Sequence, residues 1–337
     1  MMKIGIIGCG KIVRVRHAPE CAANPQIELA GFFDFKNDRA KELTEEFGGK
    51  VYMSVEEMLK DQSVDGVIVC TSNKTHAEVT IEALRAGKHA LCEKPMCTSV
   101  KEALDMEDNA KKTGKLLMIA HNQRFAQVHI RAKELLQSGA IGKVLNFRTE
   151  FSHGGPEGWS IDAGNSWFLN KEEAFIGAMG DLGVHKIDLM RWFLEDEFIS
   201  ISASVVNMDK KNSSGAPAGI DDCGICILHS NSGVWGTITA SWCNYGIVNN
   251  STTFYGTEGV MTIADPHSTN SIMISRGEEM VEYQVKEQAS SGVADAFADA
   301  VLCGKESPVS GHEGVQCMKI VLSALQSAEE EKMIRIV

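Results

Sequence analysis

The sequence contains no long hydrophobic run, no excess of positive charge and no regular cysteine pattern. No stretch approaches the length of a membrane span, and the apolar run at the start, Met1 to Gly8, is too short for a signal peptide. The formal net charge of −12 argues against nucleic acid or an acidic membrane as the main partner. The ten cysteines are scattered, which suits free, mostly buried thiols in a reducing cytoplasm.

One cysteine pair, Cys223 and Cys226, has the spacing of a metal or redox motif. It lies in a predicted strand, where residues three apart face opposite sides, and no second pair is near it in the sequence. We therefore predict no metal site. The composition is otherwise that of an ordinary globular protein, with 44% hydrophobic and 23% charged residues. A chain of 337 residues is too long for one core, which predicts two domains.

A glycine-rich loop follows the first predicted strand, Lys3 to Ile7, and opens a helix. In Gly8-Cys-Gly-Lys-Ile-Val13 the first glycine permits a tight turn, and the second lets the backbone approach a pyrophosphate at the helix N-terminus. Val13 stands where a third small residue normally allows close packing, so we expect the helix to lie slightly farther from the strand. Lys11 is either a cofactor contact or an ordinary helix-surface residue. The predicted cofactor contacts here are Gly8, Gly10, Lys11 and Ile12.

Asp34 ends the next predicted strand, Glu28 to Phe33, about twenty residues beyond the loop. A carboxylate at this place can accept hydrogen bonds from an adenosine ribose, and it would repel a 2′-phosphate. The sequence therefore favours NAD as the cofactor. Lys36 and Arg39 follow closely and leave NADP open.

Strands and helices alternate up to about residue 122, as βαβ units require. This pattern predicts a doubly wound parallel sheet of the Rossmann type over residues 1–122. Four polar residues follow the buried strand Val64 to Cys70, at the sheet edge where the glycine loop also lies. We add them to the predicted cofactor site: Thr71, Ser72, Asn73 and His76. The alternative for His76 is a histidine whose hydrogen bonds are satisfied by the local backbone.

Glu93-Lys94-Pro95 follows the short apolar strand His89 to Cys92 and so lies at the same edge. Pro95 fixes its own φ and biases Lys94 toward extended backbone. A lysine held in this way is positioned for chemistry beside the cofactor, although a lone motif of this kind is more often a surface turn. Glu93 and Lys94 complete the predicted cofactor contacts.

Residues 123–337 have a different pattern, in which short strands are joined by polar turns. The pattern predicts an α+β domain with an open, mostly antiparallel sheet and helices on one face. The other face could cover the substrate or pair with another subunit, and we expect a homodimer or homotetramer formed through this sheet.

Asp181, His185 and Asp188 have the spacing of one helix face. An aspartate four residues before a histidine can orient the imidazole and raise its basicity. The same spacing suits a surface ion pair or, less well, a metal site. Spacing alone leaves the three possibilities open.

Several segments together resemble the Gfo/Idh/MocA oxidoreductase family. They are the N-terminal glycine loop, Thr71-Ser-Asn-Lys-Thr-His76, Ala86-Gly-Lys-His-Ala-Leu-Cys-Glu-Lys-Pro-Met96, His121-Asn-Gln-Arg-Phe125 and Gly180-Asp-Leu-Gly-Val-His-Lys-Ile-Asp188. The resemblance extends from residue 3 to about residue 194, with the motifs in the expected order. The sequence departs from the family pattern at Val13 and at Phe175-Ile-Gly177, where a glycine-rich run is usual.

The resemblance implies roles for individual residues. Lys94 would contact the reacting hydroxyl or carbonyl oxygen, and Asp181 and His185 would face it, with His185 as proton acceptor or donor. The resemblance also places four residues near the substrate or cofactor: Asn122, Arg124, His153 and Trp167.

The implied activity is NAD(P)-dependent hydride transfer between the nicotinamide and a hydroxyl-bearing carbon of a sugar, polyol or cyclitol. His185 has a suitable unperturbed pKa of about 6.5, and a Lys94 ammonium would stabilise a developing alkoxide. Lys94 is the alternative base if burial or a positive neighbour lowers its pKa. Two other functions stay open: a glycoside hydrolase that uses NAD in a transient redox cycle, and a non-catalytic NAD- or sugar-sensing regulator.

Overall fold

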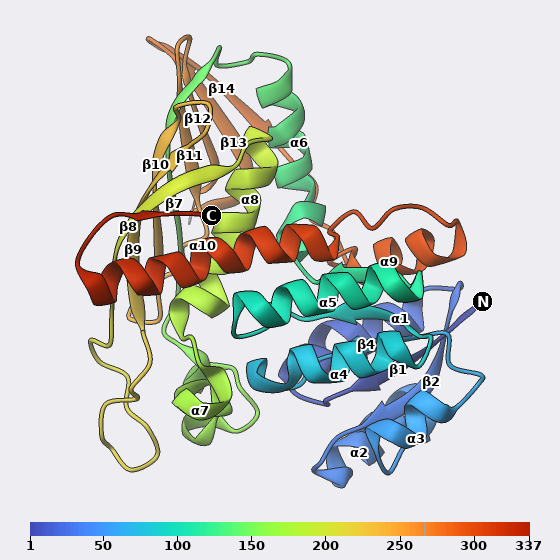
Figure 1. Ribbon diagram of the computed structural model, residues 1–337. Coiled ribbons are helices and arrows are strands. Elements are labelled where there is room, and N and C mark those ends of the chain that lie inside the picture. Colours follow the sequence, from blue (N-terminus) through green and yellow to red (C-terminus); the bar gives the residue numbers. More distant parts are fainter. Residues whose placement is uncertain (266) are drawn as a thin grey trace.

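The computed structural model describes residues 1–265 and 267–337, which form two sheet-based units (Figure 1). The first unit contains a parallel sheet with the strand order β3-β2-β1-β4-β5-β6. This is the order of dinucleotide-binding doubly wound sheets, and it confirms the predicted fold class for this half. Its strands are β1 (Met2–Ile7), β2 (Ile27–Phe33), β3 (Lys50–Val51), β4 (Gly66–Val69), β5 (His89–Cys92) and β6 (Leu117–Ile119).

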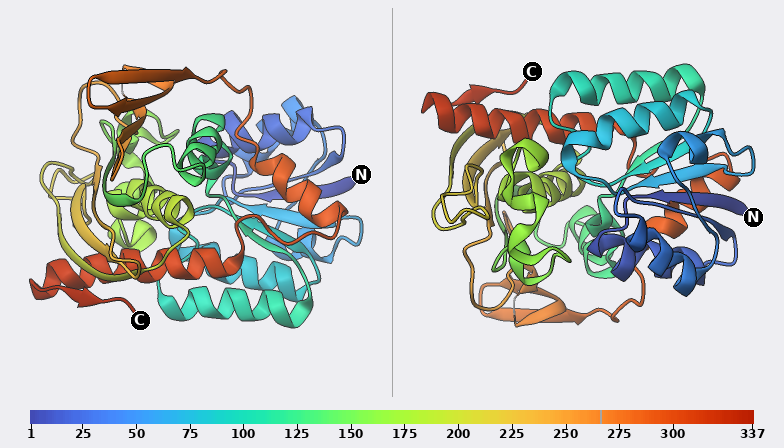
Figure 2. Two further views of the ribbon diagram at one scale, coloured as in Figure 1. Left: turned by 90° about the horizontal axis from the view of Figure 1, so that it is seen from above. Right: turned by 90° about the horizontal axis from the view of Figure 1, so that it is seen from below.

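Helices cover both faces of this sheet (Figure 2). One face carries α3 (Val55–Lys60), α4 (Asn73–Arg85) and α5 (Val100–Thr113), and the other carries α1 (Ala18–Ala23) and α2 (Asn37–Phe47). Helices α3 and α5 begin at side-chain caps, because Ser54 accepts a hydrogen bond from the N–H of Glu57 and Ser99 accepts one from the N–H of Glu102.

The second unit is built on a sheet with the order β14-β13-β12-β11-β7-β10-β9-β8-β15. Neighbouring strands are antiparallel except β7 and β10, in agreement with the predicted mostly antiparallel sheet. Its strands are β7 (Val144–Ser152), β8 (Phe198–Val206), β9 (Cys223–Ser230), β10 (Trp235–Ser241), β11 (Thr252–Gly256), β12 (Val260–Asp265), β13 (Ser268–Arg276), β14 (Glu279–Gln284) and β15 (Ile334–Arg335).

Helices α6 (Gln127–Gln137) and α8 (Val184–Leu194) pack on one face of this sheet (Figure 1). Helix α7 (Lys171–Ala174) and a π-helical turn, Met179–Gly183, precede α8 and lie close to the first unit. No helix among residues 1–265 and 267–337 is long and apolar enough to cross a bilayer.

The end of the chain returns to the first unit. Helix α9 (Val293–Leu302) contacts α1, and α10 (Gly311–Glu330) lies along α5, as both views of Figure 2 show. Between them the carbonyl of Val309 accepts a hydrogen bond from the N–H of Ile119 at the sheet edge. A single division at residue 122 therefore separates the two sheets but not the helices that pack on them.

Candidate active site

The carboxyl ends of β1, β4 and β5 meet at one edge of the parallel sheet, beside the turn that precedes α8. The cleft there has two connected parts. An inner chamber of about 260 Å³ contains Lys94 and His185, and an outer groove of about 880 Å³ contains Gly8 and Asp34. The other predicted residues that line the inner chamber are Gly10, Lys11, Ile12, Thr71, Asn73, His76, Glu93, His153, Trp167 and Asp181, while Ser72 lines the outer groove.

The glycine loop leaves room for a ligand close to its backbone. Gly8 has a φ of +91°, and a Cβ there would lie 2.4 Å from the carbonyl oxygen of Cys70. A Cβ at Gly10 would meet no atom within 4 Å, because this residue faces the open cleft. Val13 is fully buried and begins a π-helical turn, Val13–His17. The loop therefore has the exposed backbone that a pyrophosphate requires.

Asp34 lines the outer groove, where its carboxylate accepts hydrogen bonds from the backbone N–H groups of Cys9 at 2.7 Å and Lys36 at 2.8 Å. Lys36 and Arg39, the two cations that kept NADP as an alternative cofactor, both contact a carboxylate of the second unit. Asp162 Oδ1 lies 2.6 Å from Arg39 and 3.1 Å from Lys36 Nζ. These bonds hold the loop that contains Asp162 over the groove.

Lys94 is fixed by two bonds to Asp181. Its Nζ donates to Asp181 Oδ1 at 2.7 Å and to the Asp181 carbonyl at 2.9 Å. Asp181 is held in turn by Trp242, whose Nε1 donates to Asp181 Oδ2 at 3.1 Å. An ammonium has three N–H groups, so one stays available to a molecule in the chamber.

Two buried side chains hold the segment that contains Lys94. Glu93 accepts from the N–H of Lys94 at 3.1 Å and lies 2.8 Å from His17 Nε2. Burial raises the pKa of Glu93, but the His17 hydrogen bond and the nearby positive charges outweigh it and bring the pKa to about 2. His76 contacts the carbonyls of Pro95 at 2.8 Å and Thr71 at 3.1 Å. His76 thus positions the Lys94 segment through its backbone.

His185 faces the same chamber as Lys94. Burial, followed by the positive charge of Lys94, holds the pKa of His185 well below its usual value, so the ring is neutral at pH 7. Its Nδ1 is buried and has no hydrogen-bond partner among the described residues, which leaves Nε2 as the nitrogen available to a bound molecule.

The predicted orientation of His185 by Asp181 is wrong. Both carboxylate oxygens of Asp181 contact other groups, Lys94 and Trp242, and no hydrogen bond joins Asp181 to His185 in the described structure. The reason is local, because Asp181 lies in the π-helical turn Met179–Gly183. Bonding from i to i+5 widens that turn, so residues four apart no longer lie above one another as in an α-helix.

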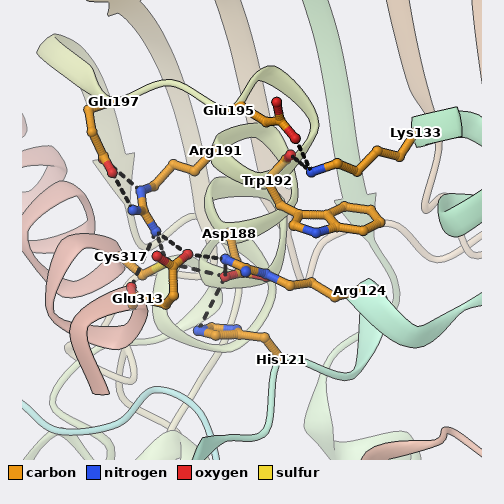
Figure 3. A network of polar contacts seen from close by, with 10 residues as sticks. All are labelled: His121, Arg124, Lys133, Asp188, Arg191, Trp192, Glu195, Glu197, Glu313 and Cys317. Atoms are coloured by element: carbon orange, nitrogen blue, oxygen red, sulfur yellow. Dashed lines mark hydrogen bonds and ion pairs between the residues drawn. The ribbon is translucent and has the colours of Figure 1, made fainter. Parts of the chain in front are cut away.

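Arg124 and Asn122 do not line either part of the cleft. Arg124 donates two bonds to Asp188, at 2.8 and 2.6 Å, and also contacts Glu313 on α10 (Figure 3). Its role is to tie the end of the first unit to α8 and α10. The resemblance-based placement of Arg124 and Asn122 beside the substrate is therefore not supported by the geometry.

His121, Asp188 and Cys317 bring three potential metal ligands within 4.8 Å of one another (Figure 3). Arg124 occupies the Asp188 carboxylate, and a guanidinium nitrogen of Arg191 lies 3.8 Å from Cys317 Sγ. Burial raises the pKa of Cys317 well above its usual range, so the sulfur is a thiol. Two guanidinium groups and a neutral thiol make this cluster unsuitable for a cation.

The inner chamber also contains groups that the sequence did not suggest. Arg16 lines it, as do Phe151 and Phe168. Phe168 stacks on Trp167 with ring centroids 3.9 Å apart. Nδ1 of His153 accepts the N–H of Gly155 at 2.9 Å, which leaves its Nε2–H free to donate. No sequence motif marks Trp242, although it holds Asp181 in place.

Each half of the chain matches a known protein-family profile. Residues 2–121 match the profile described as "Oxidoreductase family, NAD-binding Rossmann fold", and residues 129–262 match the "GFO/IDH/MocA C-terminal domain". The chain belongs to the GFO/IDH/MocA oxidoreductase family. This confirms the resemblance and the expectation of NAD as the cofactor.

Among curated relatives, the chain is 31% identical to glucose-6-phosphate 3-dehydrogenase of Bacillus subtilis over 66% of this chain and 62% of that protein. It is 26% identical to myo-inositol 2-dehydrogenase of Thermotoga maritima over 99% of this chain and 98% of that protein. The alignment thus covers less than two thirds of the first relative and nearly all of the second. A crystal structure of aldose-aldose oxidoreductase from Caulobacter crescentus has a TM-score of 0.87 at 24% identity over 99% of both chains, which shows a shared fold.

The residues of this cleft fit NAD. The open space at Gly10, the positive φ of Gly8 and the groove-lining Asp34 are the features that a dinucleotide needs at a parallel-sheet edge. Gly8 and Gly10 would hold the pyrophosphate, and Asp34 the adenosine ribose.

Proposed function

We propose that the protein is an NAD-dependent dehydrogenase that oxidises a hydroxyl-bearing carbon of a sugar, polyol or cyclitol. The observation that carries the proposal is that a fixed ammonium, Lys94, and a neutral imidazole, His185, line one small chamber beside the glycine loop. Family membership supports it, as do the relatives named as sugar and cyclitol dehydrogenases.

Each of the two groups has a separate task in the reaction. When bound, NAD supplies the acceptor for the hydride that leaves the substrate carbon. His185 Nε2 accepts the proton of the reacting hydroxyl, which its neutral state allows. The third N–H of Lys94 donates to the same oxygen and stabilises the negative charge that develops on it.

The supporting residues keep this arrangement ready before the substrate binds. Trp242 fixes Asp181, and Asp181 fixes Lys94, so the ammonium needs no reorientation during the reaction. His153 Nε2–H is placed to bind a further hydroxyl of the substrate.

A panel of sugars, inositols and their phosphates tests the proposal. Each compound is incubated with the enzyme and NAD, and absorbance at the NADH band is followed. Net accumulation of NADH with at least one compound supports a dehydrogenase. Release of a sugar from a glycoside without net NADH would instead indicate the hydrolase with transient redox chemistry, and no turnover with any member contradicts the proposal.

Replacement of Asp34 tests the cofactor preference. In Asp34→Ser the carboxylate that faces the ribose is lost, so affinity for NAD should fall by about tenfold or more and the NADP/NAD ratio should rise. Both dissociation constants are measured by titration calorimetry. The control is Asp38→Ser, an exposed position on α2 that should leave the ratio unchanged. A ratio unaffected by Asp34→Ser would remove Asp34 from the cofactor site.

Self-association through the second sheet is also proposed. Ile225 and Ile227 of β9, Trp235 of β10 and Val206 of β8 are 43–52% exposed, and strand register places them on the face turned away from α6 and α8. An apolar patch of this kind on a sheet indicates an interface.

The variant Ile225→Lys/Ile227→Lys places charges in the middle of this face. We expect the assembly to dissociate to the monomer, as measured by light scattering after size exclusion. Leu104→Lys, at an equally exposed apolar position on α5, should leave the mass unchanged. A wild-type protein that is monomeric at micromolar concentration contradicts the interface.

The ten cysteines form no disulfide, which supports a reducing compartment such as the cytoplasm as the site of action. Cell fractionation with an antibody against the protein tests this part of the proposal.

A further inference from the structure

The inner chamber holds more positive charge than its own acidic groups balance. Three carboxylates line it, and each already has partners: Glu93 with His17, Asp162 with Arg39, and Asp181 with Lys94. Two chamber-lining cations are left over, Lys11 and Arg16. Neither of these two side chains makes a hydrogen bond or ion pair with any described residue. The chain as a whole has a net charge of −12, yet this small cavity is locally positive because two of its cations are unpaired. A locally positive cavity favours the binding of an anion.

The two cations occupy different places. Lys11 is exposed and stands at the start of the helix that follows the glycine loop, where a cofactor phosphate is expected. Arg16 lies one turn further, in the π-helical turn Val13–His17, and is partly buried. It lines the chamber but not the outer groove. Lys11 has the same lining, but only the charge of Arg16 acts on His185 and Glu93, which places Arg16 on the side of the reacting groups.

Arg16 is also electrostatically close to the reacting groups. Its positive charge is one of the contributions that lower the pKa of His185, together with burial and Lys94, and it contributes to the low pKa of Glu93. Glu93 is bonded to His17 and to the N–H of Lys94, and no hydrogen bond or ion pair joins it to Arg16 among the described residues. A neutral sugar in the chamber would leave Arg16 partly desolvated and without a counter-ion.

We infer that Arg16 binds an anionic substituent of the substrate, a phosphate or a carboxylate, so that the enzyme prefers an acidic sugar or cyclitol to its neutral parent. This inference rests on the proposed dehydrogenase function. A planar guanidinium can donate two parallel N–H bonds to either oxyanion, and it keeps its charge at any working pH. The anion then anchors one end of the molecule while the reacting hydroxyl lies between Lys94 and His185.

Matched substrate pairs test the inference with wild-type enzyme, Arg16→Gln and the control Arg14→Gln. Arg14 lies on the same turn, but its guanidinium pairs with Glu42 outside the chamber. The pairs are glucose with glucose 6-phosphate, glucose with glucuronate, and myo-inositol with its 1-phosphate. The wild type should prefer an acidic member, and the phosphate and carboxylate arms tell which anion it is. Arg16→Gln should lower kcat/KM for that member by about 30-fold or more while changing the neutral parent by no more than about threefold.

A binding measurement keeps the test independent of turnover. NAD-loaded protein is titrated with inorganic phosphate and, separately, with acetate, at constant ionic strength. The wild type and Arg14→Gln should bind one of these anions, and Arg16→Gln should not. Affinity for NAD alone should be equal in all three proteins.

The possible outcomes separate the two proposals. Absence of NADH formation with every compound contradicts the dehydrogenase, whereas the anion titration still decides the role of Arg16. Turnover that favours the neutral parents and is unaffected by Arg16→Gln overturns the anion site and leaves the dehydrogenase standing. Weaker NAD binding in Arg16→Gln without added anion would assign Arg16 to the cofactor and would also overturn the inference.

Discussion

Replacement of Lys94 by methionine is expected to reduce kcat by about 10³-fold while the dissociation constant for NAD changes by no more than about twofold. Methionine keeps an unbranched side chain only one atom shorter than lysine, but it removes the N–H that we expect to stabilise the developing alkoxide. It also leaves the Asp181 carboxylate without its partner at 2.7 Å, which places an uncompensated negative charge beside a reaction that builds one. Because the glycine loop and Asp34 are untouched, cofactor binding should persist.

Single-turnover and steady-state rates of NADH formation, together with calorimetry of NAD binding, measure this effect. Lys101→Met is the matched control, since Lys101 is exposed on α5 and pairs only with Asp105. A Lys94→Met enzyme with normal turnover would show that Lys94 does not act on the substrate. A loss of NAD affinity as large as the loss of kcat would make Lys94 a cofactor ligand instead.

Replacement of His185 by glutamine should lower kcat/KM by about 10²- to 10⁴-fold, because a general base is lost while the approximate shape of the side chain is kept. The pH profile of the wild type is the sharper part of this prediction. Burial and the charge of Lys94 hold the pKa of His185 well below 6.5, so the base is already deprotonated there. Activity should therefore stay level as the pH falls through 6.5 and decline only at lower pH.

The profile of kcat/KM between pH 4.5 and 8 checks this expectation. In His185→Gln the low-pH decline should disappear together with most of the activity. A wild-type midpoint at or above 6.5 would contradict the neutral, depressed state of His185, and a residual activity near that of the wild type would exclude His185 as the base.

The first half of the fold could be predicted from the sequence because its signals are local. Ser54 and Glu57 satisfy helix-start donors within four residues, and Gly8 provides a φ of +91° that other residues rarely adopt. Strand order then follows from right-handed βαβ connections. The same logic brought the segment with Lys94 to the cofactor edge, since strand ends in a parallel sheet share one side.

The return of α9 and α10 to the first unit was not predicted. It depends on contacts between segments nearly 200 residues apart, such as the bond from the N–H of Ile119 to Val309, and no local pattern encodes such a pairing. Helix α10 packs against β8 of the second unit as well as against α5 of the first, and its amphipathic sequence specifies neither neighbour.

The sequence predicted which residues form the candidate site better than it predicted the hydrogen bonds between them. The spacing of Asp181 and His185 predicted that they share one helical face. A π-helical turn changes the register there, and Asp181 accepts a hydrogen bond from Lys94 instead. Arg124 matched a family motif, yet its charge balances Asp188. No sequence motif marks Arg16, and only the structure shows that no acidic group among the described residues pairs with it.

The convergence of Lys94 and His185 on one oxygen is tested most directly by a crystal structure of the enzyme with NAD and the best compound from the panel. The structure should show a single hydroxyl or carbonyl oxygen within about 2.6–3.2 Å of both Lys94 Nζ and His185 Nε2, with its carbon facing C4 of the nicotinamide. A bound substrate whose oxygen at that carbon contacts neither group, or only one of them, would contradict the mechanism.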